Sequence, residues 1–317
     1  MTTATFYSEE SANRRKSFLL ALFVVAFLAV FGHVIGYVVG LGTGNEVAYG
    51  IGALAIAIAF GLLSVAGSYF GGDKLVLASS HAQEIGPQQS PALFNVVAEM
   101  ATAAGVPMPK VYIIDDPSPN AFATGRDPQH SSVAITSGLL QKLNREELQG
   151  VIGHEMSHVR NYDIRFTLIV GVLVGSIALL AQLFLRYTFW FGGGRRRSSS
   201  GGDGQVQLVL MLVGVVLALL SPLIAMLLQL AISRKRELLA DADGALLTRN
   251  PNGLADALQK ITSDPHSMRH ANKATAHLFI ASPLHDTTGK PKGFMAGLFD
   301  THPDPAVRIA KLREMAL

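Results

Sequence analysis

The sequence contains no cysteine. It therefore has no disulfide framework, no cysteine nucleophile, no thiolate zinc site and no cysteine-ligated iron–sulfur cluster. Any bound metal must be held by histidine and carboxylate side chains.

Charged residues are also scarce. They make up 15% of the 317 residues, whereas soluble globular proteins have about 25%. They are absent from four apolar blocks, Ser17–Asn45, Val47–Gly72, Phe166–Leu185 and Gly204–Ser233. Each block is long enough to cross a hydrocarbon core of about 30 Å as a helix. The blocks predict a membrane protein with four apolar, transmembrane helices.

The first two blocks predict spanning helices at about 17–40 and 47–70. Arg14, Arg15 and Lys16 precede the first block as they would in a signal peptide. Its apolar run is longer than the roughly 7–15 residues of a signal peptide, and a second block follows at once. The net charge of +3 is small and lies beside the blocks, which indicates membrane topology and no nucleic-acid partner.

The remaining segments predict one soluble α+β domain with a small β-sheet, because helical periodicity alternates with short β-rich runs. The first part contains a helix from Ser90-Pro91 to Ala104, strands at 111–115, 120–125 and 132–136, and a helix from the cap residue Asn144 to about Asn161. The second part contains helices near 234–248 and 253–262 and a final helix from Asp304-Pro305.

The predicted order of segments interleaves membrane and soluble parts. It comprises a cytoplasmic N-terminal tail (1–16), a first transmembrane hairpin (17–72), the first part of the soluble domain (73–164), a second apolar hairpin (165–233) with a Gly/Ser/Arg linker at 191–204, and the second part of the soluble domain (234–317).

The motif His154-Glu155-Met156-Ser157-His158 carries the clearest chemistry. Two histidines four residues apart lie on one face of a helix, where their ring nitrogens can occupy two corners of a zinc tetrahedron. Glu155 flanks such a metal and can take a proton from the attacking water and pass it to a leaving amine. The alternative is a pair of surface histidines, but the apolar neighbours predict a buried helix and favour the metal site.

A zinc hydrolase needs a third protein ligand. Asp163 is one candidate, although it lies so close to His158 in the sequence that a local pairing is favoured. Glu237 is the stronger candidate, because a second helix would present Glu237 and Asp241 on one face. One would be a ligand and the other would accept the N–H of a histidine ring.

These motifs together resemble the HtpX family of membrane zinc metallopeptidases, which are relatives of the CAAX prenyl endopeptidases. The likeness covers nearly the whole chain and rests on the segments 120–125, 154–158, 233–245 and 301–312 in this order, with two apolar blocks before and two after the His154 motif. It implies a mainly α membrane fold with a zincin-type peptidase domain. It also implies endoproteolysis of misfolded membrane proteins in quality control.

The resemblance assigns roles to residues of this sequence. His154, His158 and Glu237 would bind one Zn²⁺ per subunit, and Glu155 would be the general base. Asp241 would accept a hydrogen bond from the ring N–H of a ligand histidine. An edge strand would bind extended substrate through main-chain hydrogen bonds, and it consists of Asn120, Ala121, Phe122, Ala123 and Thr124. His302 would stabilise the oxyanion, whereas the sequence alone favours a loop histidine there.

The topology follows from the charges that flank the blocks. The helix of His154 precedes the third block and Glu237 follows the fourth, so both reach one metal only if the blocks between them return the chain to the same side. Nine basic residues flank the blocks on this side: Arg14, Arg15, Lys16, Lys74, Arg160, Arg165, Arg234, Lys235 and Arg236. The other side has four: Arg186, Arg195, Arg196 and Arg197. This bias predicts a multi-pass protein of the cell membrane with a cytoplasmic active site, although the cluster Arg195–Arg197 leaves open whether the last two blocks span.

Two other functions compete with proteolysis. A transporter would carry ionisable groups within its spans, but the blocks contain only His33. A catalytically silent scaffold that keeps the zinc fold is disfavoured by the intact Glu155. The sequence does not define the oligomeric state or the substrates.

Overall fold

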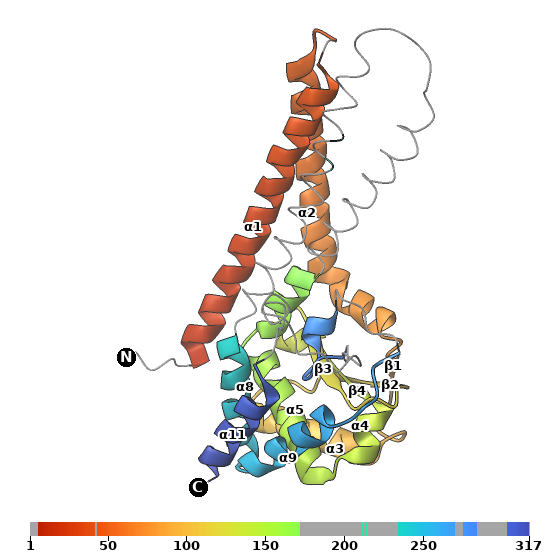
Figure 1. Cartoon of the computed structure of the whole chain (residues 1–317), viewed down its shortest axis with the longest axis vertical. Coiled ribbons are helices and arrows are strands. Elements are labelled where there is room, and N and C mark those ends of the chain that lie inside the picture. Colours follow the sequence, from red (N-terminus) through yellow and green to blue (C-terminus); the bar gives the residue numbers. More distant parts are fainter. Residues whose placement is uncertain are drawn as a thin grey trace. The chain divides into compact units, whose positions relative to one another are not determined.

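The computed structural model describes residues 6–41, 43–171, 211, 214, 234–269, 275–283 and 303–316. These residues are mainly helical and include one small sheet. The chain divides into two compact units (Figure 1). Unit 1 contains Met1–Lys16, Tyr69–Leu168 and Gln229–Leu317, and unit 2 contains Ser17–Ser68 and Ile169–Leu228.

The first two helices are longer than the predicted spans: the first begins before residue 17 and the second ends beyond residue 70. Helix α1 is Phe6–Val39 and helix α2 is Glu46–Ser79. Both are long and apolar enough to cross a membrane, within Ser11–Tyr37 and Glu46–Ser79 respectively. Charged residues end the apolar runs but not the helices, because helix formation tolerates charged side chains. The third and fourth apolar blocks lie almost wholly outside the described residues.

Small residues bring α1 and α2 together in unit 2. A Cβ atom added at Gly32 would lie 2.5 Å from the Cβ of Ala57, and one added at Gly36 would lie 2.4 Å from the carbonyl oxygen of Tyr49. The two backbones therefore approach as closely as helices do in membranes, where small residues replace bulky ones at the contact.

The sheet in unit 1 has four strands in the order β1-β2-β4-β3. Strand β2 (Lys110–Ile114) runs parallel to β4 (Ser131–Thr136), and β3 (Ala121–Gly125) runs antiparallel to β4 at one edge. These strands lie within one residue of the predicted ones. Strand β1 (Gln83–Glu84) pairs antiparallel with β2, and its two residues are too short a run for sequence periodicity to detect.

The helices of unit 1 begin and end at recognisable signals. Helix α3 (Pro91–Ala104) starts with proline and ends before Gly105, whose φ of 68° is left-handed and suits glycine. Helix α5 (Arg145–Arg160) opens with a capping box between Asn144 and Glu147. The other helices are α4 (Ser137–Lys142), α8 (Arg234–Thr248), α9 (Pro251–Thr262) and α11 (Pro305–Met315), with 3-10 turns η1 (Pro128–His130) and η2 (Ala276–Leu278).

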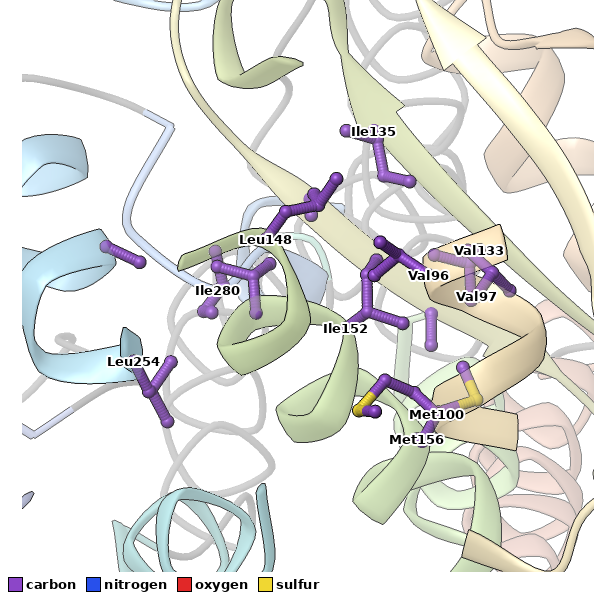
Figure 2. Packing of buried hydrophobic residues seen from close by; sticks show 14 of the residues in the cluster. Val96, Val97, Met100, Val133, Ile135, Leu148, Ile152, Met156, Leu254 and Ile280 are labelled. Atoms are coloured by element: carbon purple, nitrogen blue, oxygen red, sulfur yellow. The ribbon is translucent and has the colours of Figure 1, made fainter. Parts of the chain in front are cut away.

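Helix α5 is the central element of unit 1, where it packs against α3, α8, α9 and β3 (Figure 1). Its apolar face, with Ile152 and Met156, is fully buried against α3 and the sheet (Figure 2). Leu254 of α9 belongs to the same core. Burying these side chains fixes α5 in place, so the polar groups on its other face are held rigidly.

Candidate active site

Glycine residues allow α5 and α8 to cross closely. A Cβ atom added at Gly244 of α8 would lie 2.8 Å from the backbone nitrogen of His154, and one added at Gly153 would lie 3.2 Å from the carbonyl oxygen of Gly244. Glu237 and Asp241 precede Gly244 by seven and three residues on the same helix, which places them on the face that meets α5. This crossing brings two distant parts of the sequence to one site.

Three predicted ligand residues lie together at the crossing. The Nε2 atoms of His154 and His158 are 3.2 Å apart. Glu237 Oε2 lies 3.8 Å from His154 Nε2, and Glu237 Oε1 lies 3.6 Å from His158 Nε2. His154 and Glu237 are buried, and His158 is partly so. Two imidazoles and one carboxylate thus present ligand atoms to a common point.

This arrangement fits a divalent metal. In a tetrahedral zinc site with ligand bonds of 2.0–2.1 Å, ligand atoms are about 3.3 Å from one another. The observed separations of 3.2, 3.8 and 3.6 Å are close to this value. Imidazole and carboxylate are suitable ligands for zinc and leave a fourth position for water.

A carboxylate lies behind each histidine ring. Asp241 Oδ1 is 2.9 Å from His154 Nδ1, and Asp163 Oδ2 is 3.0 Å from His158 Nδ1. A carboxylate on the second ring nitrogen fixes the tautomer that leaves Nε2 for a metal. Asp163 thus contacts the ring of His158, which agrees with the local pairing favoured by the sequence.

Arg308 of α11 holds the carboxylate behind His154. Its Nε and Nη2 donate to the two oxygens of Asp241 at 2.8 and 2.7 Å, and its Nη1 donates to the carbonyl of Ile280 at 2.8 Å. All of these groups are buried. Burial raises the pKa of Asp241, but the charge of Arg308 and its hydrogen bonds outweigh burial and lower that pKa to about 2.

Glu155 lies beside the metal-ligand group and lines a small cavity of about 30 Å³ with His158, Glu237 and Ala123. Burial, with the nearby charge of Glu237, raises the pKa of Glu155 to about 7, against the opposing effects of His158 and of a hydrogen bond from the Ala123 backbone. A carboxyl group with such a pKa exchanges its proton near neutral pH, as a general acid–base group does.

The two histidines differ in their electrostatic surroundings in the metal-free protein. Burial lowers the pKa of His154, although Asp241 opposes this effect. Burial also lowers the pKa of His158, but the hydrogen bond with Asp163 and the charge of Glu237 outweigh it and raise that pKa to about 9. Because a metal binds only neutral imidazole, its binding at this site would release a proton.

The predicted substrate strand lies at the sheet edge. Strand β3 is the end strand and packs against α5. Part of its outer edge already contacts this chain: Ile280 N–H donates to the carbonyl of Ala121 at 2.9 Å, and Asn120 Nδ2 donates to the carbonyl of Ala281 at 3.0 Å. Ala123 lines the cavity of Glu155, so the strand passes the candidate catalytic group.

His302 lies outside the described residues. Arg308 contacts Asp241, and Asn13 Nδ2 donates to Asp163 Oδ1 at 2.7 Å. The sequence assigned neither residue a role, because these contacts join segments far apart in the chain. The segment 301–312 of the family motif was the only signal that pointed toward Arg308.

Comparisons with known proteins identify the family of this chain. Residues 87–316 match Peptidase family M48. The chain is 42% identical over 317 residues to a protein named Protease HtpX homolog from Caldanaerobacter subterraneus subsp. tengcongensis, covering 100% of each chain. It is 44% identical over 312 residues to the homolog from Lactobacillus helveticus, covering 98% of this chain and 99% of the relative. It is 48% identical over 242 residues to that of Ligilactobacillus salivarius, covering 76% and 79%.

The fold is mainly helical with a small mixed sheet, and its HExxH helix meets a carboxylate from α8. These features define the class as a metallopeptidase. The chain belongs to peptidase family M48, among the HtpX proteases. As a protease it acts on polypeptides, and its two long apolar helices indicate a membrane protein.

Proposed function

We propose that this protein is a zinc-dependent endopeptidase of the cell membrane that cleaves misfolded or damaged membrane proteins in quality control. The observation that carries the proposal is the group of His154, His158 and Glu237, whose ligand atoms lie within 4.8 Å of one another beside Glu155. The wider role in quality control rests on the family resemblance.

In the proposed mechanism, His154, His158 and Glu237 hold one Zn²⁺ per subunit. When bound, zinc supplies a Lewis acid that polarises the scissile carbonyl and activates water. Glu155 removes a proton from the attacking water and delivers it to the leaving amine. Asp241 keeps His154 in the tautomer that faces the metal.

The substrate would bind as an extended strand along Asn120–Thr124. Main-chain hydrogen bonds at a sheet edge recognise a peptide without demanding a particular sequence, which suits a protease for misfolded proteins. Because Ile280 and Ala281 occupy the edge at Asn120 and Ala121, substrate pairing would use the part nearer Ala123 or displace this segment. His302 would stabilise the oxyanion.

The experiment that tests this proposal uses the detergent-solubilised full chain. We expect the wild-type protein to degrade casein, and a chelator to abolish this activity. Glu155→Gln should retain zinc and lose proteolysis, because it keeps the size of the side chain but not its basicity. Glu146→Gln, an exposed change on the same helix, is the matched control and should cleave normally.

Two results would contradict the proposal. Cleavage by Glu155→Gln at the wild-type rate would refute the assignment of the base. A wild-type protein that binds zinc but does not cleave casein or unfolded membrane proteins would indicate a silent scaffold.

The proposed topology is four spans, with the predicted segments 1–16, 73–164 and 234–317 in the cytoplasm. It rests on the excess of basic residues at that side of the apolar blocks. A tag placed in 192–204 should be cleaved by protease added to the periplasmic or outer face of intact membranes. Protection of that tag would contradict a spanning second hairpin.

A further inference from the structure

The segment ahead of the first apolar block contacts the turn that ends α5. Asn13 is buried, with 1% of its surface exposed. Its Nδ2 donates to the carbonyl oxygen of Asn161 at 3.0 Å and to Asp163 Oδ1 at 2.7 Å. Segments about 150 residues apart in the sequence therefore meet next to the site, within unit 1.

The next residue contacts the same turn. Arg14 Nη2 donates to the hydroxyl of Tyr162 at 2.8 Å, and its guanidinium carbon lies 4.4 Å from the centre of that ring. Asn13 and Arg14 thus contact all three residues of the turn Asn161–Asp163.

This turn has an unfavourable backbone conformation. Tyr162 has a φ of 59°, which is left-handed and costs energy for any residue with a Cβ atom. Such a conformation persists only where the surroundings impose it. The contacts of Asn13 and Arg14 are surroundings of this kind.

The turn is what lets Asp163 reach the metal-ligand group. In a continuous helix a residue five positions beyond His158 would lie about 140° around the axis and point away from it. Because the chain turns at Tyr162, Asp163 Oδ2 instead lies 3.0 Å from His158 Nδ1. The other oxygen, Oδ1, accepts from Asn13 and lies 3.4 Å from Arg236 Nη1. One carboxylate is therefore oriented from both sides.

We propose that Asn13 is a positioning residue of the metal site, which acts through Asp163 to hold the ring of His158. Its amide is neutral, so it orients the carboxylate without cancelling the negative charge that faces the imidazole. The segment ahead of the first apolar block is then a working part of the peptidase and not only a tail. This inference rests on the proposed zinc site.

The test measures zinc affinity by competition with a chromogenic chelator, using the full-length protein in detergent. Asn13→Asp keeps the shape of the side chain but replaces the donor with a carboxylate that faces Asp163. We expect it to weaken zinc binding about 10-fold, within the range seen when groups behind metal ligands are changed. Asn13→Ala removes the donor without adding charge and should weaken binding less. Arg15→Gln, an exposed change in the same segment, should bind zinc as the wild type does.

A double-mutant cycle separates positioning from general destabilisation. If Asn13 acts through Asp163, then Asn13→Asp should weaken zinc binding no further once Asp163→Ala is present. The proposal would be wrong if the loss of zinc affinity in the double variant equalled the product of the losses in the two single variants. It would also be wrong if metal-free Asn13→Asp had a lower unfolding temperature but unchanged zinc affinity. If Asn13→Asp does not fold, Asn13→Ala provides the same cycle.

The outcomes also distinguish this inference from the proposed function. A wild-type protein that binds no zinc would refute both. Zinc binding and proteolysis by the wild type, together with unchanged zinc affinity in both Asn13 variants, would refute only the role of Asn13.

Discussion

The buried ion pair between Arg308 and Asp241 should contribute strongly to the stability of unit 1. Arg308→Met keeps most of the apolar length of the side chain but removes both hydrogen bonds to Asp241 and the one to Ile280. It leaves Asp241, 3% exposed, without its cationic partner and next to Glu237. Removing one partner of a buried pair typically costs about 3–5 kcal/mol.

A loss of this size should lower the unfolding temperature by about 6–20 °C, at roughly 2–4 °C per kcal/mol for a unit of this size. The assay is thermal unfolding in detergent followed by far-UV circular dichroism, on metal-free protein so that lost zinc does not contribute. Arg313→Met is the matched control on the same helix. Arg313 pairs with Asp256 and is 40% exposed, so its loss should cost about 0–1 kcal/mol.

The comparison of the two arginine variants shows whether the buried ion pair contributes more to stability than the exposed one. Equal unfolding temperatures for Arg308→Met and Arg313→Met would refute the reasoning, because it attributes the difference to burial and bidentate geometry. A folded Arg308→Met protein should also bind zinc more weakly, since Asp241 would no longer be held against His154.

Three further predictions concern packing, capping and metal. Gly150→Ala should lower the free energy of unfolding by about 1–3 kcal/mol through overpacking, because its Cβ would lie 2.6 Å from the backbone nitrogen of Leu254. The control is Gly86→Ala, whose Cβ would have its nearest neighbour 3.7 Å away, and it should unfold like the wild type. Asn144→Ala should lower the free energy of unfolding, measured by denaturant titration, by about 1 kcal/mol, because it removes the side chain that accepts from Glu147 N–H. An unchanged denaturant midpoint would contradict the capping role. Zinc at 100 times its dissociation constant should stabilise the protein by about 2.7 kcal/mol. A chelator should therefore lower the unfolding temperature, and added zinc should restore it. The same unfolding temperature with and without chelator would contradict a structural contribution of the metal.

Local signals explain which parts of the fold the sequence could predict. The helix from Pro91 ends before Gly105, and α5 starts after Asn144, as the sequence indicates, because proline, glycine and capping residues act on their immediate neighbours. Strand β1, Gln83–Glu84, was not predicted, because it exists only through its pairing with β2. Similarly, α2 continues past Gly72 to Ser79. The uncharged run ends at Gly72, but charged residues can continue a helix.

The same distinction applies to the site. His154, Glu155 and His158 follow from spacing on one helix. Glu237 was favoured over Asp163 because it shares a helix face with Asp241, and the family resemblance then assigned it as the third ligand. The contact of Asn13 with Asp163 had no sequence signature, because any asparagine can make it and only the folded chain brings the two segments together.

The proposed zinc site is tested most directly by the zinc content of the purified protein, measured by elemental analysis beside its variants. We predict one zinc per chain in the wild type and in Glu155→Gln, and a clear loss in Glu237→Ala. Full zinc occupancy in Glu237→Ala would contradict the ligand set and point to Asp163 as the third ligand.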